Sequence, residues 1–178
     1  MERKKTLLMI VDYQERLVPS IYNHQKILAK AKQVIQAFEV FGIPMIVTEQ
    51  YPKGLGPTVA QIKDCLNNEV PIFDKMTFSA YLAEIQTLLK EKQIEDVILI
   101  GMETHVCVYQ TTRELIEDGY RVHIVQDAIS SRTAENAESG FAMMRDLGAS
   151  ITNSEALIYE IMKVAGTDEF KKILKIVK

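Results

Sequence analysis

The chain has 178 residues, of which 47% are apolar and 25% charged, with a formal net charge of −3 and a pI of about 5.7. This composition is typical of a single globular domain, residues 1–178, that is large enough to bury a sizeable core. The slight acidity, without a basic run, argues against a dedicated nucleic-acid surface. The two cysteines, Cys65 and Cys107, do not make a disulfide framework and favour a reducing compartment.

The first apolar run indicates a buried strand rather than a membrane anchor. It covers Leu7 to Val11 and ends at Asp12, so it is too short to span a membrane and lacks a small-residue cleavage site. We therefore expect a cytoplasmic protein with no membrane partner. A continuous apolar run suits a strand that is covered on both faces of a parallel sheet, which places Asp12 at its carboxyl end.

The remaining chain alternates between strand and helix patterns. Apolar residues at helical spacing between Gln25 and Phe41 predict a long helix that Gly42 ends. Further strands are predicted at 43–48, 70–73, 97–100, 121–125 and 149–152, and further helices at 59–66, 82–90, 104–119, 133–147, 154–163 and from 167 onward. The segments 49–58 and 127–132 are predicted to be loops, and Thr133 is expected to cap the helix that it opens.

This alternation predicts an α/β domain with a parallel sheet and helices on both faces. Ligands bind such sheets outside the carboxyl ends of the strands, where the sequence places Asp12, Lys75 and Cys107. A carboxylate can accept the proton of a thiol, and a lysine charge favours both the carboxylate and the thiolate. Cys107 also follows a strand–turn–helix junction, where N–H groups without a helical partner stabilise a thiolate or an oxyanion.

Each of these residues also has a purely structural interpretation. Cys107 could pack a helix against the sheet, Asp12 could cap a turn, and Lys75 could be a solvated charge. His105, two residues before Cys107, could act as a base. Because Asp12 is available for that role, we expect His105 to line a pocket or to bond a loop. Cys65 is expected to be an inert helix residue.

With these residues the chain resembles the isochorismatase-like cysteine hydrolases, which include nicotinamidases, N-carbamoylsarcosine amidases and isochorismatases. The resemblance rests on Asp12 with Gln14, on Lys75, and on the stretch 101–108, a form of the signature Gly-x-x-Thr-x-x-Cys-Val. It extends from Leu7 to about Ala156 and is stronger toward the isochorismatase domain-containing proteins, some of which carry a ribonuclease label. It implies a three-layer α/β/α, Rossmann-like fold with six parallel strands in the order 3-2-1-4-5-6.

The resemblance also implies roles for individual residues. It implies a catalytic triad of Asp12, Lys75 and Cys107, a cis peptide bond between Met102 and Glu103, and an oxyanion hole formed by the backbone N–H groups of Glu103 and Cys107. Substrate contacts are expected from six residues: Gln14, Gln50, Tyr51, Phe78, Thr104 and His105. Relatives usually form dimers or larger assemblies. Self-association is also favoured by the apolar residues of the segment 154–163, namely Leu157, Ile158, Ile161 and Met162.

One departure from the family bears on the chemistry. Nicotinamidases bind a metal through an Asp-x-His segment and a later histidine, whereas the corresponding region 49–53 has no histidine. The sequence has three histidines, and their positions show no metal-ligand spacing: His24, His105 and His123. We therefore predict no catalytic metal, no other cofactor and a substrate other than nicotinamide.

The presence of the thiol favours hydrolysis of an amide or a related C–N bond of a small molecule through a thioester. Two alternatives remain open. One is hydrolysis of a vinyl ether with Asp12 as the acid, and the other is a catalytically silent binding role. A nuclease function lacks a metal cluster, paired histidines and a basic aromatic face for RNA.

Overall fold

The computed structural model describes residues 1–178. Six parallel strands form one sheet in the order β3-β2-β1-β4-β5-β6, which confirms the predicted order. The strands are β1 Thr6–Val11, β2 Met45–Gln50, β3 Ile72–Lys75, β4 Asp96–Met102, β5 Arg121–Ser130 and β6 Ser150–Thr152. The apolar runs of β1 and β4 occupy the centre of the sheet, where every residue of both strands is buried.

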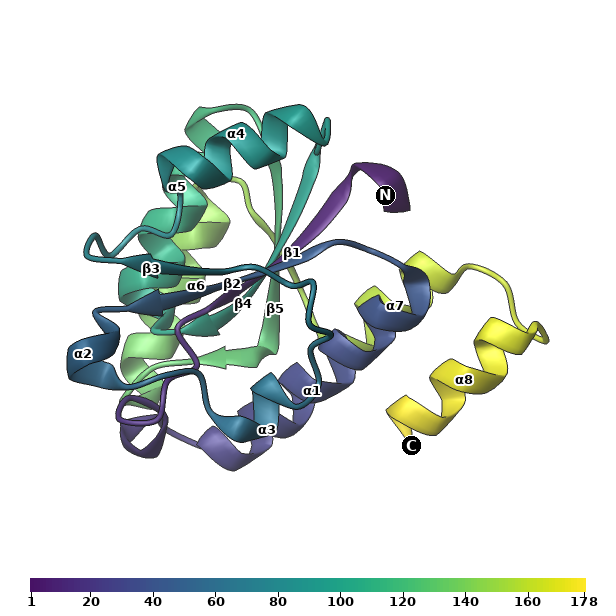
Figure 1. Ribbon diagram of the computed structural model, residues 1–178, viewed down its shortest axis with the longest axis horizontal. Helices are drawn as coiled ribbons and strands as arrows, with labels where there is room; N and C mark the ends of the chain where they lie inside the picture. The colour runs from purple at the N-terminus through teal and green to yellow at the C-terminus, as the bar shows by residue number, and fades with distance from the viewer.

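Helices cover both faces of the sheet, so the molecule has three layers (Figure 1). The core on one face includes side chains of α1, α3, α7 and α8, and the core on the other face includes side chains of α4, α5 and α6. The helices are α1 His24–Phe41, α2 Pro52–Leu55, α3 Ala60–Lys63, α4 Ala83–Glu91, α5 Tyr109–Glu117, α6 Ala134–Asp146, α7 Ser154–Met162 and α8 Asp168–Val177. None of them combines the length and the apolar character that a membrane-spanning helix needs.

The carboxyl-terminal helix α8 changes the interpretation of α7. It packs against α1 and α7, and Arg3 Nη1 holds its first turn by donating to Glu169 Oε1 at 2.7 Å. The four apolar residues of α7 that favoured self-association are buried within the chain, none more than 7% exposed. That argument for self-association is therefore wrong, because the chain's own α1 and α8 cover this face.

Strand β5 is longer than the sequence indicates. The predicted strand stops at Val125 because Gln126 and Asp127 are polar, yet β5 continues to Ser130. Its pairing with β4 jumps from Leu99↔Ile124 to Gly101↔Ile129, so the polar pair lies in an irregular stretch of the strand. Asp127 is satisfied there, since its carboxylate accepts from the backbone N–H and the hydroxyl of Ser154 at the start of α7.

The segment after β4 also departs from the prediction of one helix over 104–119. A π-helical turn, η3 Thr104–Val108, comes first, and α5 begins only at Tyr109. Cys107 therefore lies in a wide turn rather than in the first turn of an α-helix. Such π turns are rare and often occur at functional sites.

Smaller differences concern element boundaries and caps. Strand β2 begins after Pro44, which cannot donate a backbone hydrogen bond, and the predicted loop 49–58 contains the short helix α2. Thr133 caps α6 as predicted, because its hydroxyl accepts from the Asn136 N–H. Helix α7 begins at Ser154 as predicted, and Asn153 caps it, because its side chain accepts from the Ala156 N–H.

Candidate active site

Asp12 is the first residue after β1 and lies at the carboxyl edge of the sheet. Its φ of 56° is in the left-handed region, which non-glycine residues seldom adopt. On the neighbouring strand, Gly101 has a φ of 150°, and a Cβ added there would lie 2.3 Å from the Val11 carbonyl oxygen. Glycine at position 101 therefore allows β4 to pass close to the end of β1, next to Asp12.

Asp12 and Lys75 form a fully buried ion pair. Lys75 Nζ lies 2.7 Å from Asp12 Oδ2, and both side chains are 0% exposed. Three further oxygens accept from Lys75 Nζ: Gln50 Oε1 at 2.7 Å, the Phe78 carbonyl at 2.9 Å and the Thr77 carbonyl at 3.3 Å. Thr48 Oγ1 donates to Asp12 Oδ1 at 2.9 Å. The pair is thus surrounded by the polar partners that a buried charge requires.

Cys107 joins this pair from η3 and is 6% exposed. Burial raises the pKa of the Cys107 thiol to about 12, and the negative charge of Asp12 adds to the increase, which the Lys75 charge only partly offsets. Burial likewise raises the pKa of Asp12, despite the opposing charge of Lys75 and hydrogen bonds from Lys75, Thr48 and Cys107. Burial of the thiol and the charge of Asp12 therefore oppose the thiolate that the sequence predicts for the free protein.

The peptide bond between Met102 and Glu103 is cis. The backbone N–H of Glu103 donates to no acceptor within the protein. Its side chain is held at the edge of the site, since Glu103 Oε1 accepts from Arg132 Nε at 2.9 Å and from the Arg132 backbone N–H at 3.2 Å. A free backbone donor thus lies four residues before Cys107 in the chain.

Two of the residues expected to contact the substrate, Gln14 and Gln50, instead make hydrogen bonds within the protein around Lys75. Gln14 is fully buried, and its amide donates to the carbonyls of Gln50 and Gly56 and accepts from the Gln50 N–H. Gln50 holds Lys75 through Oε1 and the Met76 carbonyl through Nε2. Their amides thereby fix the segments that follow β2 and β3.

The other four expected residues differ in their exposure and in their contacts. Tyr51 and Phe78 expose about half of their surfaces, 48% and 54%. Thr104 is fully buried, and its hydroxyl has no hydrogen-bond partner. His105 turns its Nδ1 to Ser131 Oγ, at 2.9 Å.

Sequence reasoning did not find three residues that shape this region. Thr48 bonds Asp12, Ser131 bonds His105, and Gly140 on α6 lies so close to η3 that an added Cβ would be 2.8 Å from the His105 backbone nitrogen. A polar residue at the end of an apolar strand was the available signal for Thr48. Nothing local marks Ser131 or Gly140, since their partners are distant in the sequence.

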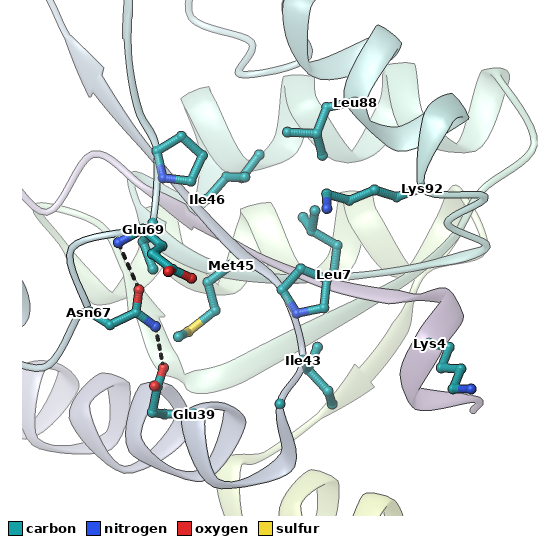
Figure 2. Close-up of a pocket in the computed structure, with 14 residues that line it drawn as sticks. Lys4, Leu7, Glu39, Ile43, Met45, Ile46, Asn67, Glu69, Leu88 and Lys92 are labelled. Carbon is teal, nitrogen blue, oxygen red and sulfur yellow. Dashed lines mark hydrogen bonds between the residues drawn. The ribbon is translucent and has the colours of Figure 1, made fainter.

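A cavity of about 660 Å³ lies at the opposite edge of the sheet (Figure 2). It is lined by residues at the starts of β1 and β2, in the segment before β3 and on α4, among them Leu7, Met45, Val70 and Leu88. No residue of the buried triad lines it. No group of three or more His, Cys, Asp or Glu side chains is placed to hold a metal ion anywhere in the chain.

Comparisons with known proteins agree with the fold. The secreted isochorismatase effector Isc1 of Phytophthora sojae is 36% identical over 97% of this chain and 84% of its own length. Isochorismatase domain-containing protein 1 of Danio rerio is 37% identical over 94% of this chain and 59% of its own length.

Two solved structures have the same fold. MAR1 ribonuclease from Caenorhabditis elegans matches with a TM-score of 0.95 at 39% identity, covering 99% of this chain and 91% of that chain. The YcaC gene product from Escherichia coli, described as an octameric hydrolase of unknown specificity, matches in fold with a TM-score of 0.90 at 20% identity, covering 99% and 88%. The model of the isochorismatase domain matches residues 6–156. This protein therefore belongs to the isochorismatase domain family.

Proposed function

We propose that this protein is a cysteine-dependent hydrolase of small-molecule amides or related C–N bonds. The observation that carries the proposal is the meeting of Asp12, Lys75 and Cys107 in one buried cluster at the carboxyl edge of the sheet. A thiol next to a carboxylate supplies a nucleophile and a base close to each other. Because burial raises the pKa of Asp12, the carboxylate is a stronger proton acceptor than an exposed aspartate.

In the first half of the reaction, Asp12 accepts the thiol proton while Cys107 Sγ forms a bond to the substrate carbonyl carbon. The carbonyl oxygen becomes an oxyanion, which the N–H groups of Glu103 and Cys107 stabilise. When the tetrahedral intermediate collapses, the C–N bond breaks and Asp12 returns the proton to the departing nitrogen. The acyl group remains on Cys107 as a thioester.

In the second half, Asp12 takes a proton from a water molecule, whose oxygen attacks the thioester carbon. The C–S bond then breaks, the acid product leaves, and the proton on Asp12 returns to the Cys107 sulfur. Lys75 keeps its positive charge throughout and stabilises the negative charge that alternates between Asp12 and the sulfur. This cycle needs no cofactor.

The surroundings support a small substrate with an apolar part. Tyr51, Met76 and Phe78 follow β2 and β3 and are 48%, 73% and 54% exposed. Such exposure of large apolar side chains in one region is typical of a binding surface. We propose that Tyr51, Phe78, Thr104 and His105 form the substrate site and that a second copy of the chain covers the exposed side chains, in line with the octameric state described for YcaC.

The vinyl-ether alternative also has an observation in its favour. A raised pKa of Asp12 favours its protonated form, which is the form that an acid catalyst needs. The two reactions differ in their use of the thiol, since protonation of a vinyl ether by Asp12 requires no nucleophile at position 107.

The proposal is tested by a turnover screen of amides, ureides, vinyl ethers and RNA with wild type, Cys107→Ala and the matched control Cys65→Ala. We expect amide hydrolysis that only Cys107→Ala abolishes, with an acyl adduct on Cys107 detected by mass spectrometry. Vinyl-ether turnover that survives Cys107→Ala would replace the proposal with the alternative. RNA cleavage that Cys107→Ala abolishes would favour the ribonuclease activity for which the nematode relative is named, and no turnover of any class would favour a binding role.

A further inference from the structure

The turn η3 carries Cys107 and must hold the sulfur at a fixed place relative to Asp12. One side of the turn rests on α6, where Gly140 allows contact with the backbone of Thr104 and His105. Another side faces the end of β5, where two polar contacts cross the gap: His105 Nδ1 with Ser131 Oγ, and Glu103 Oε1 with Arg132. Small displacements of a nucleophile reduce rates strongly, so these contacts bear on catalysis.

The contact between His105 and Ser131 has the features of a structural anchor. Ser131 is 0% exposed, and His105 is the only partner of its hydroxyl. The backbone around Ser131 is itself fixed, because Tyr22 N–H donates to the Ser131 carbonyl and Ser130 Oγ donates to the Tyr22 carbonyl. A buried hydroxyl that loses its partner destabilises the fold, so the pairing favours one position of His105.

The contact between Glu103 and Arg132 is weaker. The Arg132 side chain is 60% exposed, and solvent-exposed ion pairs contribute little to stability. The same turn therefore has one buried and one exposed contact with the end of β5. Substitutions at the buried contact can therefore be compared with a substitution at the exposed contact.

We propose that His105 is a positioning residue, which anchors the Cys107 turn to the end of β5 through Ser131 rather than serving as the base. Asp12 acts directly on the thiol through its charge, whereas His105 Nδ1 is paired with Ser131 Oγ at 2.9 Å. The inference rests on the proposed function for its catalytic consequence, but its structural part concerns the reactivity of Cys107 alone.

The test uses the side-chain geometry of asparagine, whose amide nitrogen takes nearly the place of histidine Nδ1 and cannot titrate. Two assays are used: iodoacetamide alkylation of Cys107 across pH, and amide hydrolysis. They compare the single variants His105→Asn, His105→Leu, Ser131→Ala and Arg132→Ala. They also include the double variant that combines His105→Leu with Ser131→Ala. We expect His105→Leu and Ser131→Ala each to lower kcat by about tenfold, which corresponds to about 1.4 kcal/mol in activation free energy. The change in KM should be smaller than the change in kcat. The double variant should be no worse than either single one. His105→Asn should recover most of the rate that His105→Leu loses, and Arg132→Ala should remain close to wild type.

Three results would overturn the inference. Ser131→Ala with wild-type kcat and wild-type alkylation would show that the anchor is not needed. His105→Asn as slow as His105→Leu, with an altered pH profile of alkylation, would make His105 the base. Additive effects in the double variant would show that the two side chains act separately. If no amide is hydrolysed by the wild type, the proposed function fails, while the alkylation rates of the same variants still decide the positioning role.

Discussion

The two edges of the sheet each bury one aspartate against cations, with opposite consequences for the carboxylate. At the amino edge, the first residue of β4, Asp96, accepts three hydrogen bonds: two from Arg121 and one from His123. Burial raises the pKa of Asp96, but these hydrogen bonds outweigh it and leave the pKa below its ordinary value. At the carboxyl edge, burial dominates and the pKa of Asp12 is raised.

The difference shows what each edge is suited for. Arg121 is 60% exposed and reaches Asp96 from the surface, so the charges remain partly hydrated and the network stabilises the carboxylate. Asp12, Lys75 and Cys107 are all buried, and the carboxylate lies beside a thiol that competes for the same proton. Groups whose pKa values are shifted by burial and by a specific neighbour are those that proton-transfer chemistry uses.

The largest effect is expected on turnover. Asp12→Asn should lower amide hydrolysis by about 10²–10⁴-fold, because an amide cannot accept the thiol proton. Asp96→Asn removes a carboxylate from the other edge and should leave the rate per folded molecule unchanged. Steady-state kinetics of both variants, normalised to active folded protein, measure this contrast. Equal losses in the two variants would mean that the edges do not differ in function.

The next effect is on the free energy of unfolding. Lys75→Met should lower it by about 3–5 kcal/mol, because it leaves the Asp12 carboxylate buried without its cation. The double variant Asp12→Asn with Lys75→Met should recover part of the loss, and Arg121→Met should cost less, since His123 remains bonded to Asp96. Urea unfolding followed by circular dichroism gives all four values. A double variant less stable than Lys75→Met would contradict a destabilising lone charge.

The pH dependence of stability should have opposite signs at the two edges. The pKa of Asp96 is lowered in the folded state, so its stabilisation is present above the unfolded pKa of about 3.9 and is lost as the pH falls through the folded pKa. The pKa of Asp12 is raised, so its contribution is most favourable below about pH 3.9 and declines as the pH rises through the folded pKa.

This sign difference can be measured by urea unfolding at several values between about pH 3 and about pH 7. The range includes the ordinary carboxyl pKa of about 3.9. The deficit of Asp96→Asn relative to wild type should shrink as the pH falls. As the pH falls, the free energy of unfolding of the wild type should rise relative to that of Asp12→Asn. Parallel curves for the two variants would show that both aspartates titrate in the same way.

The smallest of these effects is expected from Gly140→Ala. Alanine usually stabilises a helix by about 1 kcal/mol relative to glycine, but here its Cβ would lie 2.8 Å from the backbone of Thr104 and His105. We expect a net loss of about 1–3 kcal/mol from overpacking, together with slower turnover, because the Cys107 turn must move. Ser139→Ala, one residue earlier and exposed, is the control. A stabilised Gly140→Ala variant with normal turnover would refute the close packing.

Most of the fold could be predicted because its signals are local. Apolar runs such as Leu7–Val11 mark buried strands, and helical spacing marks α1, so the alternation led to a parallel sheet. The errors arose where a distant partner satisfied a polar group or covered an apolar one. Asp127 has the polar character of a loop residue, but Ser154 bonds its carboxylate within β5. The apolar residues of α7 indicate self-association, but α8 packs against them.

The sequence by itself determined which reactive residues share one edge. Asp12 and Lys75 lie at strand ends and Cys107 just past one, and parallel topology brings the carboxyl ends of all strands to the same side. Only the tertiary structure decided how these residues behave. Burial of the thiol and the charge of Asp12 raise the pKa of Cys107. Ser131, just after β5, and Gly140, on α6, contact the turn that carries Cys107. Desolvation and packing depend on which distant segments meet, and no local pattern of residue types records that.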